Sequence, residues 1–178
     1  MNKLNTLAAK VHAANHQWWH DINTGLPIER NKGELLMLVI TELAEACEGI
    51  RKNLMDDKLP HRRMEEVEMA DAYIRLLDYA GGFGIELKEI DPEVKFVPEN
   101  KGQALLNICG AVVNAGGISV VGDVPNDFWI YGALAMIEGY CLKFHLDLDA
   151  AVTEKMAYNA TRADHTAEAS RLANGKKF

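Results

Sequence analysis

Apolar residues recur at steps of three and four along almost the whole chain, and this spacing limits the fold more than any other feature. Between about Glu34 and Asn53, the repeating apolar residues are Leu36, Val39, Leu43, Ala46 and Ile50. Such steps place side chains on one face of an α-helix, whereas a half-buried strand alternates with a period of two. Strand-like alternation is almost absent, so the sequence predicts an all-α helical bundle.

Glycine, proline and polar residues divide the chain into six expected helices. The second and third have similar lengths and are joined by a short linker that ends at Pro60, so they should pack as an antiparallel hairpin. The last follows Asp147, which suits an N-cap position. The six helices are expected to start near Leu4, Glu34, Pro60, Lys101, Pro125 and Asp147.

The length and composition favour one compact domain. A chain of 178 residues is near the usual size of one domain and leaves no room for a second catalytic module. Its 48% hydrophobic and 25% charged residues are typical of a globular protein rather than a disordered one. We therefore expect a single all-α domain over residues 1–178. Residues 164–178 have little apolar content after Leu172, and we expect them to form a mobile basic tail.

The chain is acidic, with 26 Asp and Glu residues against 19 Lys and Arg residues and a net charge of −7. This balance disfavours nonspecific attraction to nucleic acid and to anionic lipid, so we expect neither as a partner. Residues 102–122 carry no charge and are long enough to span a membrane, but their asparagines, glycines and helical spacing favour a buried helix of a soluble protein. Three separated cysteines (Cys47, Cys109 and Cys141) and an N-terminus without an apolar signal core predict a cytoplasmic protein.

Two pairs of acidic residues lie at the edge of the expected core. Glu42 and Glu45 are three residues apart on the second helix, next to its apolar stripe. Glu68 and Asp71 have the same spacing on the third helix, in line with Arg75. In an antiparallel hairpin these faces meet, and carboxylates a few ångströms apart would repel one another strongly in a partly dry site. The sequence therefore predicts a divalent cation held by four carboxylates.

The ligand type indicates which cation the two pairs would hold. An all-oxygen set without His or Cys suits Mg²⁺, with Mn²⁺ as the alternative, better than zinc. Di-iron helical bundles use Glu-x-x-His pairs, and no His stands three residues after Glu42, Glu45 or Glu68. Magnesium held by few carboxylates usually keeps waters and binds substrate phosphates, so a nucleotide polyphosphate is the expected ligand.

A simpler interpretation of the acidic pairs stays open, because acidic residues at helical spacing usually form a solvated face. Having two pairs, each beside a core stripe on neighbouring helices, weakens that interpretation without removing it. The remaining acidic residues of the region are assigned to the surface, and these are Glu48, Asp56, Asp57, Glu65 and Glu66.

The last helix presents a basic face in which Lys155, Asn159 and Arg162 lie at i, i+4 and i+7. Their ammonium, amide and guanidinium groups suit phosphate oxygens, a sugar or a base, so we expect all three to bind nucleotide. The alternative is an amphipathic helix end, where the helix dipole favours basic residues.

A second set of expected nucleotide-binding residues lies near the N-terminus, where His12, Asn15 and Trp19 share one helical edge. Trp18 continues the apolar stripe that starts at Leu4 and is predicted to be in the core. Trp19 is the ring predicted to stack on a base. Packing of both tryptophans inside the protein is an equally good interpretation.

Several stretches resemble a known family. Residues 41–45 (T-E-L-A-E), followed after 22 intervening residues by residues 68–71 (E-M-A-D), resemble the E-x-x-E and E-x-x-D signature of the MazG-like, all-α nucleoside triphosphate pyrophosphohydrolases. Residues 155–162 (K-M-A-Y-N-A-T-R) are similar to the K-x-x-x-N-x-x-R stretch on that family's late helix. Residues 12–19 (H-A-A-N-H-Q-W-W), the A-D-H at 163–165 and the G-K-K-F ending resemble phage-type members, whereas residues 84–145 carry no matching motif.

The resemblance implies an activity. Members hydrolyse (deoxy)nucleoside triphosphates to the monophosphate and pyrophosphate, in sanitation or reshaping of a nucleotide pool, and phage-type members suggest purine deoxynucleotides. They are typically homodimers or homotetramers. The family often has a glutamate where Thr41 stands, so this chain lacks one outer carboxylate but keeps the ligand set. By the resemblance, Mg²⁺ would be held by Glu42, Glu45, Glu68 and Asp71, and phosphate and sugar by Lys155, Asn159 and Arg162.

The expected chemistry is in-line attack of water on the α-phosphorus, a position that only the resemblance supplies. Mg²⁺ would neutralise the triphosphate and activate the water, while Lys155 and Arg162 would stabilise charge on the leaving pyrophosphate. Glu45 is the expected proton acceptor, with Glu48 as its rival. The alternative from another class is a noncatalytic helical protein that binds Mg²⁺ or nucleotide or serves in assembly.

Overall fold

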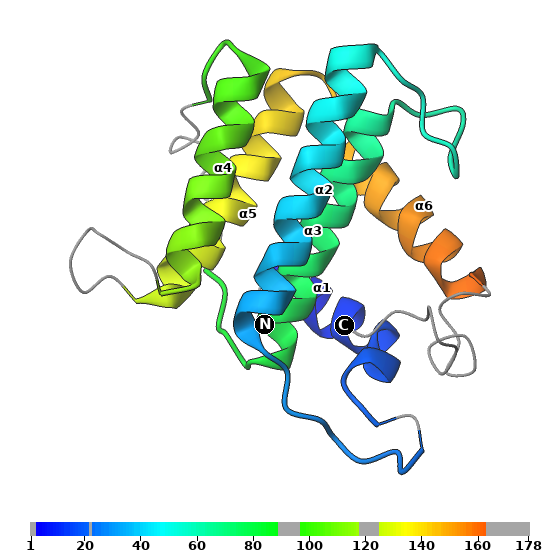
Figure 1. The fold of residues 1–178 in the computed structure, drawn as a ribbon, viewed down its shortest axis with the longest axis vertical. Coiled ribbons are helices and arrows are strands. Elements are labelled where there is room, and N and C mark those ends of the chain that lie inside the picture. Colours follow the sequence, from blue (N-terminus) through cyan, green and yellow to red (C-terminus); the bar gives the residue numbers. More distant parts are fainter. Residues whose placement is uncertain (1–2, 22, 89–96, 118–124, 163–178) are drawn as a thin grey trace.

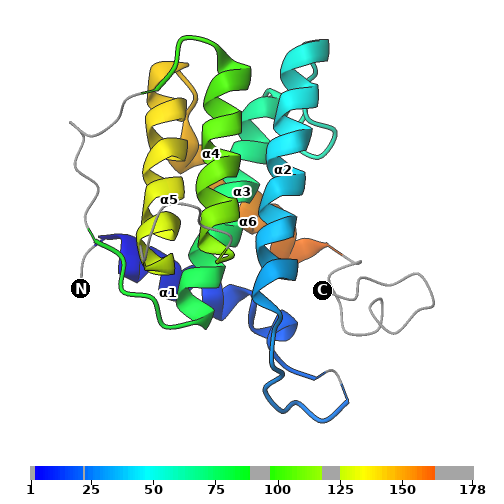
Figure 2. The same ribbon diagram turned by 60° about the vertical axis from the view of Figure 1, so that its left-hand side comes forward.

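The computed structural model describes residues 3–21, 23–88, 97–117 and 125–162 (Figures 1 and 2). These residues contain no strand, only two isolated bridge pairs, so the predicted all-α class is confirmed. The predicted tail at 164–178 and the A-D-H motif at 163–165 lie outside the described residues. The helices are α1 (Lys3–Ala14), the 3₁₀-helix η1 (His16–Trp18), α2 (Lys32–Lys52), α3 (Met64–Gly82), α4 (Lys101–Ala115), α5 (Asn126–Lys143) and α6 (Leu148–Thr161).

Polar side chains cap three of these helices and fix where they begin. The Asn31 side chain accepts a hydrogen bond from the Glu34 N–H at the start of α2, and Asn100 caps α4 in the same way. Asp147, the predicted N-cap, accepts from the Ala150 N–H at the start of α6. Each cap satisfies an N–H that has no partner inside its helix. Because Asn31 supplies the cap, α2 begins two residues before the predicted start.

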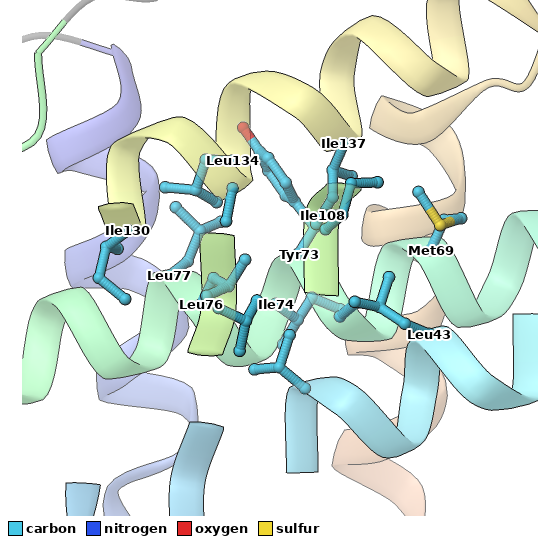
Figure 3. Close-up of a cluster of buried hydrophobic side chains, with 14 of the residues drawn as sticks. Leu43, Met69, Tyr73, Ile74, Leu76, Leu77, Ile108, Ile130, Leu134 and Ile137 are labelled. Atoms are coloured by element: carbon cyan, nitrogen blue, oxygen red, sulfur yellow. The ribbon is translucent and has the colours of Figure 1, made fainter. Parts of the chain in front are cut away.

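Helix α3 is the centre of the bundle. It contacts α1, α2, α5 and α6, and both ribbon views show other helices around it. A helix covered on several sides buries apolar residues on several faces, and each fully buried large side chain stabilises the fold by about 1.5–3 kcal/mol. Figure 3 shows the core that α3 forms with α2, α4 and α5, with the labelled side chains Leu43, Met69, Tyr73, Ile74, Leu76, Leu77, Ile108, Ile130, Leu134 and Ile137.

Helices α2 and α3 form the predicted antiparallel hairpin. The predicted stripe of α2 points into it, with Leu36, Val39, Leu43 and Ala46 buried and Ile50 partly buried. The helices pack tightly at Gly49, where a Cβ atom would lie 2.9 Å from Cβ of Met64. Glycine therefore permits the close approach that holds the acidic faces of the two helices together.

The predicted surface position of two acidic residues is wrong. Glu65 is 3% exposed; it accepts hydrogen bonds from Lys101 Nζ at 2.7 and 2.8 Å and from the Tyr140 hydroxyl at 2.5 Å. Asp56 is also buried and accepts from the backbone N–H groups of Lys58 and Leu59. A carboxylate can be buried when donors replace its water. The donors to Glu65 come from two other helices, and those to Asp56 come from the backbone two and three residues further along the connection.

The membrane interpretation finds no support in the described helices, because none of them combines the length and apolar character that a bilayer span requires. Helix α4, which lies in the uncharged segment, has only 15 residues and buries one face against the bundle. The described part of that segment is therefore a component of the core.

We predict that Lys101→Met will lower the free energy of unfolding by at least about 2 kcal/mol, because it leaves the buried Glu65 carboxylate without its cation. Urea unfolding followed by circular dichroism measures the change. Lys10→Met, which removes an exposed lysine from α1, is the matched control and should cost less than about 0.5 kcal/mol. Equal stabilities for the two variants would contradict the prediction.

Candidate functional site

Three carboxylates meet where α2 packs against α3. Glu42, Glu68 and Asp71 each offer an oxygen, and these three oxygens lie within 4.8 Å of one another. Glu42 and Glu68 are buried, and Asp71 is partly buried. The convergence follows from the hairpin, which brings one acidic residue of α2 to the two of α3. Three of the four predicted metal ligands are therefore brought together.

Glu45, the fourth predicted ligand, is not one of these three residues. It lies about one turn after Glu42 on α2, and its side chain is exposed. Partial desolvation, and then the charges of Glu42 and Asp71, raise the pKa of Glu45, so its carboxylate lies within electrostatic reach of the cluster. Its roles as a ligand and as a proton acceptor stay predictions.

Two cations pair with carboxylates of the cluster. Lys155 on α6 is 3% exposed, and its Nζ lies 2.8 Å from an Asp71 oxygen. Arg75 on α3 donates to Glu42 through Nε at 2.7 Å, and its second guanidinium nitrogen lies 2.6 Å from the same oxygen. Although burial opposes its charge, Asp71 raises the pKa of Lys155 and keeps it protonated. Lys155, predicted to bind nucleotide, therefore lies at the acidic cluster, and its role in binding nucleotide stays a prediction.

The carboxylates of α3 are held in a strongly perturbed state. Burial raises the pKa of Glu68 to about 9, and the neighbouring Asp71 charge adds to the effect. Burial also raises the pKa of Asp71, against the opposing effect of Lys155. Two cations for three carboxylates leave one negative charge in excess, so a retained proton or a bound cation would stabilise the cluster.

A cavity of about 220 Å³ adjoins the cluster. Asp71 and Arg75 belong to both, so a ligand in the cavity would reach the carboxylates. Polar, cationic, aromatic and aliphatic groups share the wall, which suits a ligand with a charged end and a flat apolar end. The lining residues are Asn15, Trp18, Trp19, Arg30, Leu35, Leu38, Asp71, Ile74, Arg75, Asp78, Asn159 and Arg162.

The basic face predicted on the last helix points toward this cavity. Asn159 and Arg162 line it, while Lys155 reaches the acidic cluster beside it. Oδ1 of Asn159 is buried, and no donor among the described residues reaches it. A buried amide oxygen without a donor is costly, so this atom fits a ligand or water that donates to it.

The two tryptophans exchange their predicted places. Trp19 is the buried ring, 8% exposed; it covers Gly82, where its ring leaves no room for a side chain. Trp18, predicted in the core, is partly exposed and lines the cavity. The reason is that α1 ends at Ala14 and a 3₁₀ turn follows, which changes the angular step between residues from that of an α-helix. Stacking of a base on Trp19 stays a prediction, but Trp18 offers the more accessible ring.

Asp78, which also lines the cavity, forms hydrogen bonds with residues of the N-terminal segment. It accepts from Trp19 Nε1 at 3.1 and 3.2 Å, and His12 Nδ1 lies 2.9 Å from the same carboxylate. Burial raises the pKa of Asp78, and these hydrogen bonds oppose the shift. His12, a predicted nucleotide-binding residue, therefore contacts Asp78 and is not among the lining residues, whereas Asn15 is.

Sequence reasoning assigned no role to Arg30, Arg75 or Asp78. Arg75 and Asp78 follow Asp71 at steps of four and three, so helical spacing alone places them on the same face of α3. Arg30 gives no such signal, because it lies in the connection before α2 and reaches the cavity through the fold. Its guanidinium donates to the backbone oxygen of Trp18.

Helix α6 is fixed beside the acidic cluster by ion pairs next to Lys155. Arg62 donates to both oxygens of Glu154 at 2.8 and 2.9 Å, and His61 Nε2 lies 2.8 Å from one of them. Arg62 also pairs with Glu66, which accepts from the Asp147 N–H at the start of α6. The connection between α2 and α3 thereby holds α6 in the position that brings its lysine to the site.

Comparison with known protein families, with curated proteins and with solved structures finds no match to this chain. The function is therefore argued from the residues of the site.

We predict a pH dependence from the Glu154 contacts. Donation by Arg62 and His61 lowers the pKa of Glu154 to about 2, below the value of about 4.3 for an unfolded glutamate. The contacts therefore stabilise the folded state above that unfolded value, and the contribution is lost as the pH falls toward 2. Glu154→Gln should be less stable than the parent at neutral pH, and the difference should shrink across this acidic window.

Urea unfolding at a series of pH values measures this difference. Glu99→Gln, which removes an exposed carboxylate that pairs with Lys143, serves as the control. A stability difference for Glu154→Gln that stayed constant from neutral to acidic pH would contradict the assignment.

Proposed function

We propose that the protein is a Mg²⁺-dependent hydrolase that converts (deoxy)nucleoside triphosphates to the monophosphate and pyrophosphate. The observation that carries the proposal is the union of a three-carboxylate cluster with a cavity whose wall contains arginines, amides and a partly exposed tryptophan. A triphosphate needs cations at one end and a stacking surface at the other, and this site offers both within one pocket.

The residues of the cluster fit Mg²⁺. Glu42, Glu68 and Asp71 offer only oxygen ligands, and their mutual distances allow a single ion to contact all three. Three carboxylates leave coordination positions for water and phosphate oxygens, as Mg²⁺ usually requires. When bound, the ion would neutralise phosphate charge and lower the pKa of water, with Mn²⁺ as a chemically similar substitute.

The chain's own cations are placed to bind the phosphates. Lys155 and Arg75 stand at the border between cluster and cavity, and Arg162 stands on the cavity wall. Their charges would hold the triphosphate and stabilise the negative charge that grows on the leaving pyrophosphate. Asn159 would hold sugar or phosphate through its amide, whose oxygen lacks a donor among the described residues.

Part of the cavity wall suits a base. Trp18 presents a partly exposed ring, and Leu35, Leu38 and Ile74 supply apolar surface from the hairpin. Bases stack on aromatic rings without strong sequence preference, so this surface would accept more than one base. The proposed substrates are therefore surplus or noncanonical nucleotides, including purine deoxynucleotides.

Glu45 is the proposed proton acceptor. It is exposed beside the cluster, and its raised pKa makes it a stronger base than an ordinary glutamate. It would take a proton from the water that attacks the α-phosphorus. Its neighbour Glu48 pairs with Lys52 and Arg51 on the same helix, which lowers the pKa of Glu48 and makes it the weaker base.

The resemblance to MazG-like pyrophosphohydrolases supports the same reaction, and with it a cytoplasmic enzyme that assembles as a homodimer or homotetramer. The second candidate is a noncatalytic protein that binds Mg²⁺ and nucleotide or serves in assembly. One observation fits this second candidate: the ion pairs of Lys155 and Arg75 stabilise the carboxylates in the absence of a metal ion. Turnover separates the two functions.

We predict that the purified protein will convert nucleoside triphosphates to monophosphate and pyrophosphate only when Mg²⁺ or Mn²⁺ is present. Glu42→Gln and Asp71→Asn should each lower kcat by at least about 100-fold, because each removes a ligand of the cation. Chromatographic separation of the products measures the reaction. Glu99→Gln is the matched control for loss of one carboxylate and should keep full turnover.

Two outcomes would contradict the proposed pyrophosphohydrolase reaction. Orthophosphate and diphosphate as products would place the attack at the γ-phosphorus. Binding of a nonhydrolysable triphosphate without turnover of any nucleotide would favour the noncatalytic function. Circular dichroism of Glu42→Gln and Asp71→Asn establishes whether loss of activity occurs with the fold retained.

We also predict that the two tryptophans will respond differently to alanine. Trp18→Ala should weaken binding of a nonhydrolysable triphosphate by about 10-fold or more with little loss of stability, because it removes a stacking surface. Trp19→Ala should lower the free energy of unfolding by about 3 kcal/mol, because it empties the space over Gly82. Calorimetric titration and urea unfolding measure the two effects, and the reverse pattern would contradict the assignment.

A further inference from the structure

The carboxylate of Asp78 attaches the N-terminal segment to α3, and both ribbon views show α1 beside the C-terminal part of that helix. Both Asp78 oxygens accept from Trp19 Nε1, and one of them lies 2.9 Å from His12 Nδ1. Since an ionised carboxylate only accepts hydrogen bonds, the second contact requires a hydrogen on Nδ1 of His12. Asp78 therefore holds one side chain of α1 and one that follows the 3₁₀ turn.

Two glycines let these side chains lie directly against α3. A Cβ atom on Gly81 would lie 2.6 Å from Cβ of His12, and one on Gly82 would overlap the Trp19 ring. The rings of His12 and Trp19 also meet edge to face, with centroids 5.0 Å apart. Close packing and hydrogen bonds to Asp78 therefore fix the same two residues.

The segment between these two residues supplies part of the cavity wall. Asn15 and Trp18 line the cavity, and the Trp18 N–H donates to the backbone oxygen of Asn15 at 2.9 Å. Trp18 is bonded to Trp19 in the chain, so a shift of Trp19 would move the wall. His12 is not among the lining residues, so its contribution to the wall is indirect.

We propose that Asp78 is a positioning residue that holds Trp18 and Asn15 in the cavity wall by anchoring His12 and Trp19 to α3. The inference rests on the proposed function, in which Trp18 is the ring that stacks on a base. Asp78 is not one of the three carboxylates that meet at the cluster. Its contribution to nucleotide binding is therefore separable from that of the metal ion.

Calorimetric titration of the full chain with a nonhydrolysable triphosphate and Mn²⁺ tests the proposal. Asp78→Leu removes both acceptor oxygens with little change in size and should weaken triphosphate binding by at least about 10-fold. Affinity for Mn²⁺ alone should stay within about threefold of the parent, because Asp78 lies two turns of α3 beyond Asp71 and salt screens charges at that distance.

His12 gives a sharper test, because it does not line the cavity. His12→Leu should weaken triphosphate binding by about 5-fold or more, since it removes a donor to Asp78. His12→Asn should keep the parent affinity, because its amide nitrogen can take the place of Nδ1 and donate to Asp78. Recovery by the smaller asparagine is a result that simple loss of packing would not give.

Glu65→Leu is the matched control for loss of a buried carboxylate. Glu65 also accepts from an aromatic side chain and pairs with a cation, namely Tyr140 and Lys101, but it does not line the cavity. Its replacement should lower stability and leave triphosphate binding at the parent affinity.

Exchange of the indole N–H groups with solvent, followed by proton NMR, tests the anchoring without any ligand. The Trp19 N–H should exchange faster in Asp78→Leu than in the parent, because it loses its acceptor. The Trp129 indole nitrogen, which is buried on α5, should keep its exchange rate.

Weaker binding in Asp78→Leu and His12→Leu, with recovery in His12→Asn and faster Trp19 exchange, would establish the positioning role. An effect of Asp78→Leu without one of His12→Leu would overturn it, because Asp78 would then act by contacting the ligand itself. If Asp78→Leu does not fold, the two His12 variants decide, and equal weakening in both would overturn the role. A parent that binds no triphosphate would contradict the proposed function and the inference with it, whereas a binding parent with unaffected variants would contradict the inference alone.

Discussion

The repulsion among buried carboxylates is the constraint on which the candidate site depends. Packing α2 against α3 brings Glu42, Glu68 and Asp71 together, and charges so close in a partly dry environment are unfavourable unless opposite charge lies nearby. The chain meets this need with Lys155 from α6 and Arg75 from α3. The position of α6 therefore follows from electrostatics as well as from packing of its apolar face.

The same groups connect stability with function. A lysine and an arginine that compensate carboxylates are also the groups that a triphosphate would need, and a cation that takes the carboxylates would leave them available for phosphate. Under the proposed function, these ion pairs would be exchanged for contacts with a metal ion and phosphate. Arg62 and Glu154 extend this arrangement, because they fix the helix that carries Lys155.

Three faces of helix α2 have different surroundings. One edge of α2 carries the acidic residues, one face is buried against α3, and another face, with Met37 and Ala44, is exposed beside α4. Helix α3 cannot divide its surface in this way because other helices surround it. Its interior position explains why its acidic residues are strongly perturbed, whereas Glu45 on α2 is exposed.

Much of the fold and part of the site could be predicted from the sequence. Helical spacing, capping residues and turn residues act locally, so they specify the helices, the hairpin and the meeting of three of the four predicted acidic residues. The same rule failed at Trp18, because a 3₁₀ turn interrupted the helix before that residue. It also failed at Glu65, whose partners Lys101 and Tyr140 are distant in sequence.

The sequence by itself determined the all-α class, the N-cap of the last helix at Asp147, and the alignment of acidic residues on two neighbouring helices. Only the tertiary structure decided which carboxylates meet, which cations neutralise them, and which tryptophan is buried. The physical reason is the separation along the chain of the residues that each interaction joins. Periodicity and capping involve residues within a turn or two of one another, whereas charge compensation and cavity shape arise from contacts between segments that only folding brings together.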